Sequence, residues 1–340
     1  MSKPIHLEKG DRILICRTDR LGDLILTTPL IESLKYSCPQ CEIDILASDY
    51  ALPVLGVNNH MKTKIGVNIP LLHSDKNAQK ELQDILIKRN YKVALMVYPD
   101  KIISKIVYKS KISIRIGTAR RFQSIYFNRF LFHSRKANKK HESEYNLDFL
   151  KFFEPSKVSY TPHVYLMEDN VKTAKEILAD ANISGRFIVL HPGSGGSADR
   201  WPLEHFIELY YILNEKNYSV VFTGSTEENK EIEKFANKRD ISLNNLAGKT
   251  DIRTLAGLLS LADIVVANST GPLHLASAVG TRVIGLYPNR HAMSPKRWGP
   301  LGTGHQVILP PNRQNEMSAI KPEDIAKIAI SMKTVPEVSE

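Results

Sequence analysis

Residues 263–288 constrain the fold of this chain more than any other stretch. Residues 263–267 have the continuous apolar pattern of a buried strand, and a polar turn follows at 268–271. A helix then begins at Pro272, and residues 282–287 form a second apolar strand. Strand, tight turn, helix and strand in this order form half of a parallel α/β sheet. The stretch therefore predicts an α/β fold in which helices connect parallel strands.

The same alternation occurs in both halves of the 340 residues. Between them, residues 156–162 contain prolines and show no periodicity, as a linker would. A chain of this length suits two α/β domains better than one core. We predict doubly wound domains at 1–160 and 161–325, with the end of a C-terminal helix and a tail at 326–340. Such sheets bind ligands beyond the carboxyl ends of their strands, so the loops that follow strands are the candidate sites.

Positive charge is concentrated in one segment. The chain has a formal net charge of +10. Residues 101–140 contain 12 Lys or Arg and no Asp or Glu, whereas the other 300 residues carry 34 basic and 36 acidic side chains. A solvated surface normally mixes both signs, so a segment without acid favours an anionic partner. Nucleic acid and a phosphorylated lipid surface both fit this description, although no recognisable nucleic-acid-binding module accompanies the segment.

The N-terminus and the cysteines indicate a compartment. No apolar run approaches the ~20 residues of a membrane span, and the N-terminus lacks the apolar core of a secretory signal. We therefore expect a cytoplasmic protein. Cys16, Cys38 and Cys41 suit a reducing compartment. Cys38 and Cys41 have CxxC spacing, but no second pair or histidine cluster accompanies them, so we expect ordinary thiols and no metal site.

Asp23 is the candidate for chemistry in the first half. It follows the apolar strand at 12–17 and a polar loop, and it stands at the start of a helix. An aspartate in this place can cap the helix or complement its dipole, and by itself that role is favoured. Alternatively, its carboxylate can accept a proton from a sugar hydroxyl.

Two loops of the second half are candidates for binding a phosphorylated ligand. The glycine-rich loop at 191–202 follows a strand and matches no P-loop pattern, but Arg200 supplies a cation that can meet a pyrophosphate. The loop at 223–228 contains Glu227 and Glu228. These acids either complement the start of the next helix or accept hydrogen bonds from ribose hydroxyls.

The polar turn at 268–271 is the third candidate. Ser269 and Thr270 can cap the following helix, and Gly271 lets a ligand approach the backbone. The N–H groups at a helix start bind anions, so a nucleotide diphosphate is the expected guest. His274 in the first turn is either a neutral core histidine or a phosphate contact.

Four motifs in order carry a family resemblance. They are RTDRLGD at 17–23 with Thr28-Pro29, HPGS at 191–194 with RWP at 200–202, NLAGKT at 245–250 and NSTGPLHLA at 268–276. Together they resemble the heptosyltransferases of glycosyltransferase family nine, from near the N-terminus to about residue 305. The resemblance implies a GT-B fold, with two Rossmann-like doubly wound domains facing across a cleft. It also implies an inverting transferase that moves heptose from ADP-L-glycero-β-D-manno-heptose to the inner core of lipopolysaccharide.

The resemblance also implies roles for individual residues. Asp23 matches the general base of the family. The expected donor-binding residues are Ser194, Arg200, Glu227 or Glu228, Lys249, Ser269, Thr270, Gly271 and His274. The helix start and the cations would stabilise the leaving diphosphate, so we expect no metal or other cofactor.

Two departures from the family pattern lie on the donor side. Many relatives have aspartate where this chain has Ser269, and many have lysine before the tryptophan motif, where this chain has Asp199. The alternatives are a transferase of the same fold that uses another nucleotide sugar for a cell-surface glycan, a non-catalytic nucleotide-sugar-binding relative, or a nucleotide-sugar epimerase.

The resemblance gives the basic segment an explanation. It would hold the protein against anionic, phosphorylated lipid A at the inner membrane face, as a peripheral protein that binds no nucleic acid. The expected contacts with the acceptor or the membrane are Arg20, Arg120, Arg121, Lys139 and Lys140.

Overall fold

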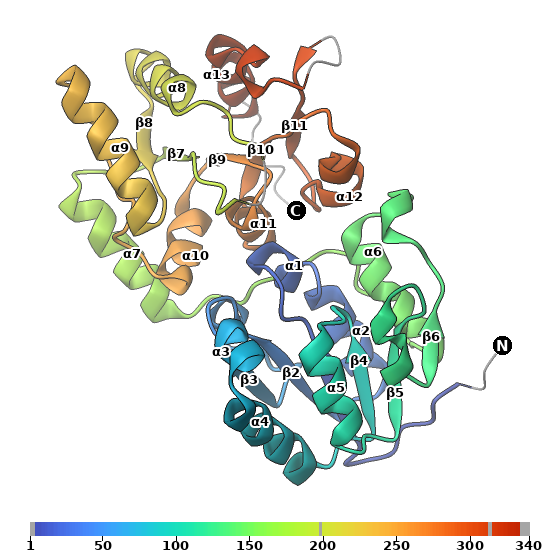
Figure 1. Ribbon diagram of the computed structural model, residues 1–340. Coiled ribbons are helices and arrows are strands. Elements are labelled where there is room, and N and C mark those ends of the chain that lie inside the picture. Colours follow the sequence, from blue (N-terminus) through green and yellow to red (C-terminus); the bar gives the residue numbers. More distant parts are fainter. Residues whose placement is uncertain (1–3, 197–198, 312–314, 334–340) are drawn as a thin grey trace. The chain divides into compact units, whose positions relative to one another are not determined.

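The chain forms two compact units in the computed structural model, which describes residues 4–196, 199–311 and 315–333. Unit 1 comprises residues 1–163 and unit 2 comprises residues 164–340. Each unit is a parallel β-sheet with helices on both faces, which confirms the predicted α/β fold class (Figure 1). No helix of the described residues is long and apolar enough to cross a membrane.

The sheet of unit 1 has six parallel strands in the order β3-β2-β1-β4-β5-β6. The strands are β1 (Arg12–Cys16), β2 (Glu42–Ser48), β3 (Thr63–Val67), β4 (Val93–Met96), β5 (Ile114–Thr118) and β6 (Arg129–Leu131). The helices are α1 (Leu21–Ile25), α2 (Thr28–Ser37), α3 (Ile69–Ser74), α4 (Lys76–Arg89), α5 (Lys101–Lys109) and α6 (Glu142–Leu147). Four 3-10 turns complete it, η1 (Leu52–Leu55), η2 (Phe122–Tyr126), η3 (Arg135–Ala137) and η4 (Asp148–Phe152).

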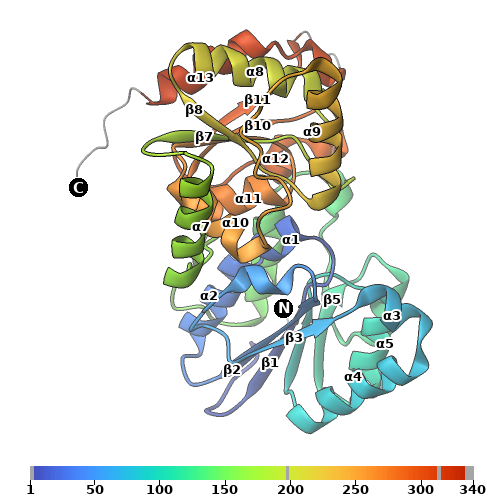
Figure 2. The same cartoon turned by 90° about the vertical axis from the view of Figure 1, so that its left-hand side faces the viewer.

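Side chains of β1 alternate between the two faces of this sheet. Leu14 and Cys16 pack with α3, α4 and α5 in one buried cluster, and these helices cover one face (Figure 2). The expected helix after β1 is divided in two by a break at residues 26–27, because Pro29 in the first turn of α2 has no N–H with which to continue the first helix. Asp23 thus lies in the first turn of the short α1.

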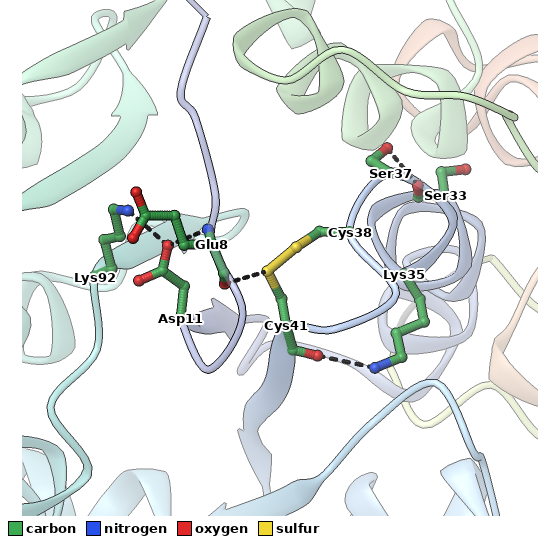
Figure 3. Close-up of a disulfide and its surroundings, with 8 residues drawn as sticks. All are labelled: Glu8, Asp11, Ser33, Lys35, Ser37, Cys38, Cys41 and Lys92. Carbon is green, nitrogen blue, oxygen red and sulfur yellow. Dashed lines mark hydrogen bonds and ion pairs between the residues drawn. A yellow bond between two sulfur atoms is a disulfide. The ribbon is translucent and has the colours of Figure 1, made fainter.

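The turn between α2 and β2 contains a disulfide. Cys38 ends α2, and the N–H of Cys41 donates to the carbonyl of Cys38 at 3.1 Å, which brings the two side chains together. Their sulfurs are bonded, with the Cα atoms 5.4 Å apart (Figure 3). The expectation of ordinary thiols was therefore wrong for this pair. Cys16 is a free, buried thiol, as expected.

The sheet of unit 2 has five parallel strands in the order β11-β10-β9-β7-β8. The strands are β7 (Phe187–His191), β8 (Ser219–Phe222), β9 (Ile264–Asn268), β10 (Arg282–Leu286) and β11 (Gln306–Ile308). The helices are α7 (Glu168–Asp180), α8 (Leu203–Glu215), α9 (Thr226–Arg239), α10 (Ile252–Leu261), α11 (Gly271–Ala278), α12 (Pro295–Trp298) and α13 (Pro322–Lys333), with 3-10 turns η5 (His291–Met293) and η7 (Met317–Ala319).

Two groups of helices cover this second sheet. Helices α8, α9 and α13 share one buried cluster with the strands, and α7 packs on α10 on the other face (Figure 2). Gly257 makes that packing close, since a Cβ there would lie 2.6 Å from the carbonyl oxygen of Asn170. Beside this sheet, Phe222 and Asn245 form an isolated parallel bridge. The β9-turn-α11-β10 arrangement follows the prediction from residues 263–288.

Candidate functional site

Arg17 is the centre of a buried group of charges in unit 1. It follows β1 at the carboxyl edge of the sheet, and its side chain is 1% exposed. Its guanidinium pairs with Asp19 at 2.8 Å, with Glu142 at 3.3 Å, and with Asp23 in a short contact. Because parallel strands end at this edge, a ligand that reaches it would meet Asp19 and Asp23, which are 16% and 13% exposed.

Helix α6 supplies the distant members of this group. His141 and Glu144 form a capping box that fixes the start of the helix beside Arg17. Glu142, in the first turn, also pairs with Arg135 at 3.1 Å. Asn146, one turn later, accepts hydrogen bonds from Arg17 at 3.2 Å and from Arg135 at 3.0 Å. We define the Arg17 cluster as Arg17, Asp19, Asp23, Arg135, Glu142 and Asn146.

The Arg17 cluster is able to bind a proton near neutral pH. Its three carboxylates face two guanidinium groups, so one negative charge is in excess. Burial raises the pKa of Asp23, Arg17 opposes this, and the charge of Glu142 raises it again. Burial also raises the pKa of Asp19 to about 7. A carboxylate with a raised pKa is a stronger base, as proton abstraction from a hydroxyl requires.

A pocket of about 560 Å³ adjoins the Arg17 cluster, with which it shares Arg135. It lies at the carboxyl ends of β4 and β5 and includes no Asp or Glu in its lining. Its basic lining residues are Arg120, Arg121, His133, Arg135 and Lys136, and its aromatic ones are Tyr98, Phe122 and Phe149. We call it the basic pocket. Its charge suits a ligand with an anionic group.

The predicted basic contacts divide into two groups. Arg120 and Arg121 line the basic pocket. The other three, Arg20, Lys139 and Lys140, are exposed outside its lining, and Lys140 is held by Asp148 at 2.6 Å. The sequence interpretation had missed Arg135, Glu142 and Asn146, since nothing in their local pattern points to chemistry.

In unit 2, Asn268 joins two of the predicted loops. Its side-chain oxygen accepts from the N–H of Trp201 at 2.9 Å, and its side-chain nitrogen donates to the carbonyl of Pro192 at 2.8 Å. The end of β9 and the glycine-rich loop after β7 are therefore held at the same edge of the sheet. Trp201 is buried in the core of unit 2.

The start of α11 retains the features of an anion site. Thr270 is the N-cap in extended conformation, and its hydroxyl donates to the carbonyl of Asn268 rather than capping the helix. The first N–H groups of a helix have no partner inside it. Here Gly271 and Leu273 supply them, because Pro272 has no N–H and the N–H of His274 donates to the carbonyl of Thr270 at 3.4 Å. His274 is buried in the first turn. The buried phenol of Tyr287 donates to the carbonyl of Trp298 at 2.7 Å. Burial raises the pKa of this phenol, and the side chain of Ser269 opposes the shift.

Of the two cations expected to meet a diphosphate, Arg200 and Lys249, only Arg200 is held in an ion pair within the described residues. Arg200 pairs with Glu231 at 2.8 Å and donates to the hydroxyl of Ser194 at 3.1 Å. Asp199 pairs with Arg290 at 2.9 Å. Lys249 is exposed in the turn after Gly248, and it makes no ion pair within the described residues.

Glu228 and Glu227 differ in their surroundings. Glu228 closes a capping box at the start of α9 and lines a cavity of about 180 Å³ with Gly193 and Arg200. A Cβ at Gly193 would lie 1.8 Å from a Glu228 carboxylate oxygen, so only glycine allows this approach. Glu227 is exposed and does not line the cavity. Of the two acids, Glu228 is thus the one beside the glycine-rich loop.

No group of three or more His, Cys, Asp or Glu in the described part of the chain is arranged to hold a metal ion.

The sequence profile of glycosyltransferase family 9 (heptosyltransferase) matches residues 79–328.

Similar proteins align with this chain over most of their own length. A putative glycosyltransferase of Haemophilus influenzae is 27% identical over 91% of this chain and 92% of its own length. Lipopolysaccharide heptosyltransferase 3 of Escherichia coli is 24% identical over 93% of this chain and 96% of its own length. Among solved structures, E. coli ADP-heptose lps heptosyltransferase II superposes with a TM-score of 0.78 at 21% identity, covering 95% of this chain and 98% of that one. A family 9 glycosyltransferase of Veillonella parvula superposes with a TM-score of 0.84 at 20% identity, covering 96% of this chain and 98% of that one. The chain therefore belongs to glycosyltransferase family 9, the heptosyltransferases.

Proposed function

We propose that this protein is an inverting glycosyltransferase that transfers heptose from ADP-L-glycero-β-D-manno-heptose to the inner core of lipopolysaccharide. The observation that carries the proposal is the buried Arg17–Asp23 pair at the carboxyl edge of the unit 1 sheet, in a chain of the heptosyltransferase family. Relatives named as lipopolysaccharide heptosyltransferases support the class of donor and acceptor.

Asp23 is the general base of this proposal. Its carboxylate takes the proton of an acceptor hydroxyl while the hydroxyl oxygen forms a bond to the anomeric carbon of the donor. The bond from that carbon to the diphosphate breaks on the opposite face, and ADP leaves with the electron pair. Arg17 orients the carboxylate, and Glu142 offsets the effect of Arg17 on its basicity.

The basic pocket is the proposed acceptor site. An inner-core acceptor carries phosphate or carboxylate groups, and Arg121 and Arg120 would pair with them. Arg135 belongs to both the pocket and the Arg17 cluster, so an anion held there lies close to the proposed base. This closeness is the reason for assigning acceptor binding to unit 1.

Unit 2 is the proposed donor site. The N–H groups at the start of α11 would receive the diphosphate, with Ser194, Lys249 and His274 as further contacts. Glu228 would accept hydrogen bonds from the ribose hydroxyls. These groups can stabilise the charge of the leaving ADP, and the proposed mechanism includes no metal ion.

A panel of nucleotide sugars tests the proposal. Purified protein is incubated with ADP-, GDP- and UDP-linked sugars, and thermal stability is recorded for each. We expect stabilisation by ADP-heptose, since a ligand that binds only the folded state raises the melting temperature. Transfer is then followed with ADP-heptose and a heptose-deficient lipopolysaccharide core. If another nucleotide sugar stabilises the protein and ADP-heptose does not, ADP-heptose is not the donor and the other sugar takes its place in the proposal.

The second candidate is a relative that uses another nucleotide sugar or binds one without transfer. The observation in its favour is that carboxylates neutralise two arginines on the proposed donor side. Arg200 pairs with Glu231, and Arg290 pairs with Asp199. Ser269 also stands where many relatives are expected to have a carboxylate. Slow hydrolysis or transfer of a bound donor would distinguish an enzyme from a binding protein.

A further inference from the structure

Four large apolar side chains of the acid-free segment face water. Tyr108, Phe122, Ile125 and Phe132 are 50%, 75%, 61% and 66% exposed. No other phenylalanine in the described part of the chain is as exposed as Phe122 and Phe132. Leaving such side chains in water gives up the free energy of burying them, so a group of them marks a contact surface. We call these four residues the apolar patch.

The residues of the apolar patch lie on neighbouring elements. Helix α5 packs against η2, where the ring of Tyr126 lies 5.7 Å from that of Tyr108. Arg120 donates from Nε to the carbonyl oxygen of Phe132 at 2.7 Å, which connects the loop before η2 with the end of β6. Strand β6 is the edge strand beyond β5 (Figure 1). The patch therefore occupies one edge of unit 1.

Cations without an acidic partner surround the patch. Six exposed basic residues between positions 105 and 129 make no ion pair within the described residues, and they are Lys105, Lys109, Lys111, Arg120, Arg121 and Arg129. Elsewhere in unit 1, Ile85 and Ile87 of α4 are also exposed, at 44% and 49%. There, however, acidic Glu81 and Asp84 share the helix with its lysines. The patch thus differs from α4 in that only positive charges surround its exposed apolar side chains.

We infer that the apolar patch and its six cations form a docking surface for an anionic lipid bilayer, with Phe122, Ile125 and Phe132 entering the interfacial region. Apolar insertion and attraction to anionic headgroups reinforce each other at such a surface. A second copy of the chain on this face would bring like charges together. Nucleic acid would use the cations but would leave Ile125 in water.

The basic pocket opens beside this surface. Arg120, Arg121 and Phe122 belong both to the pocket lining and to the patch or its cations. The anionic headgroup of a lipid-linked substrate would enter the pocket while its lipid chains remain in the bilayer. This consequence rests on the proposed function, whereas the docking surface itself does not.

Vesicle sedimentation of the full chain tests the inference in the absence of any nucleotide sugar or acceptor. We expect binding to vesicles that contain phosphatidylglycerol, weakening with added salt, and little binding to neutral phosphatidylcholine vesicles. The variant Phe122→Ser/Phe132→Ser should bind about tenfold more weakly or worse. Its matched control, Ile85→Ser/Ile87→Ser, should bind as the wild type does. Reversal of Lys105 to Glu should weaken binding about fivefold.

A fluorescence measurement reports insertion directly. In Phe122→Trp, the emission of the new tryptophan should shift to shorter wavelength on anionic vesicles, whereas Ile85→Trp should not shift. Equal vesicle binding by the serine variant and the wild type would overturn the inference, and so would absence of wild-type binding. A dimer that dissociates in Phe122→Ser/Phe132→Ser would assign the patch to a second copy instead. Transfer to a detergent-dispersed acceptor is measured separately, so that loss of docking and loss of the proposed function are distinguished.

Discussion

Arg17 and Glu142 stand 125 residues apart in the chain, and their side chains form a buried ion pair 3.3 Å long in unit 1. Through this pair, a residue of α6 acts on the carboxylate of Asp23 at the start of α1. Breaking a buried pair by removing one charge leaves the other uncompensated, which is costly for stability. The pair therefore links the folding of unit 1 with the basicity of its candidate base.

Glu142→Gln should shift the pH dependence of the reaction. Asp23 faces the charges of Arg17, Asp19, Glu142 and Arg135. The Glu142 charge raises the pKa of Asp23, so its removal lowers that pKa and moves the acidic limb of kcat/KM to lower pH. A pH series of kcat/KM measures this shift. If Glu142→Gln lowers the melting temperature but does not move the acidic limb of kcat/KM, Glu142 has only a structural role.

Asp23→Asn should reduce transfer about 10²- to 10⁴-fold, the usual effect of losing a general base. Donor binding by thermal shift should be unchanged, since the proposed donor residues lie in unit 2. Asp19→Asn is the matched control, because Asp19 pairs with the same Arg17 guanidinium at 2.8 Å. A larger loss in Asp19→Asn than in Asp23→Asn would reverse the assignment of the base.

The stability of the protein should fall as pH rises from about 4 to about 7, through the contribution of Asp19. Its folded-state pKa of about 7 lies above the ordinary value of 3.8, so the folded state binds a proton that the unfolded state releases. The unfolding free energy therefore decreases with pH in this window. Urea denaturation at several pH values should show a smaller decrease in Asp19→Asn. The carboxylates of Asp11 and Asp148 have lowered pKa values, and the stability they contribute is lost only below about pH 4.

Arg121→Ala should raise the KM for an anionic acceptor about tenfold while leaving the KM for the donor unchanged. The guanidinium lines the basic pocket and makes no ion pair within the described residues, so its charge is available to a ligand. Lys139→Ala removes an exposed cation outside the lining and should have little effect. Steady-state kinetics with a detergent-dispersed acceptor compare the two. Equal KM values in Arg121→Ala and wild type would argue against the pocket as the acceptor site.

Glu228→Gln should weaken nucleotide binding more than Glu227→Gln. Glu228 lies against Gly193 in a cavity, and Glu227 is exposed outside it. Calorimetric titration with ADP measures the difference. Glu228 also accepts the N–H of Ser225 at 2.8 Å, so Glu228→Gln keeps the capping bond and separates binding from helix stability. Stronger weakening by Glu227→Gln would assign the ribose contact to Glu227.

The sequence by itself determined the parts of this protein that depend on local pattern. Apolar runs predicted the β9 and β10 strands, and the turn before Gly271 predicted a helix start with an anion site, because period and capping are read within a few residues. The position of Asp23 after β1 followed in the same way. The excess of positive charge in residues 101–140 was also visible in composition alone.

Only the tertiary structure decided which charges meet. Glu142 and Asn146 join Arg17 because the fold places α6 beside the end of β1, and no local pattern encodes that approach. The fold likewise joins Arg200 to Glu231, where the sequence had suggested a cation available to pyrophosphate. Whether an apolar side chain is buried depends on the elements that pack over it, so the exposure of Phe122 became visible only in the folded chain.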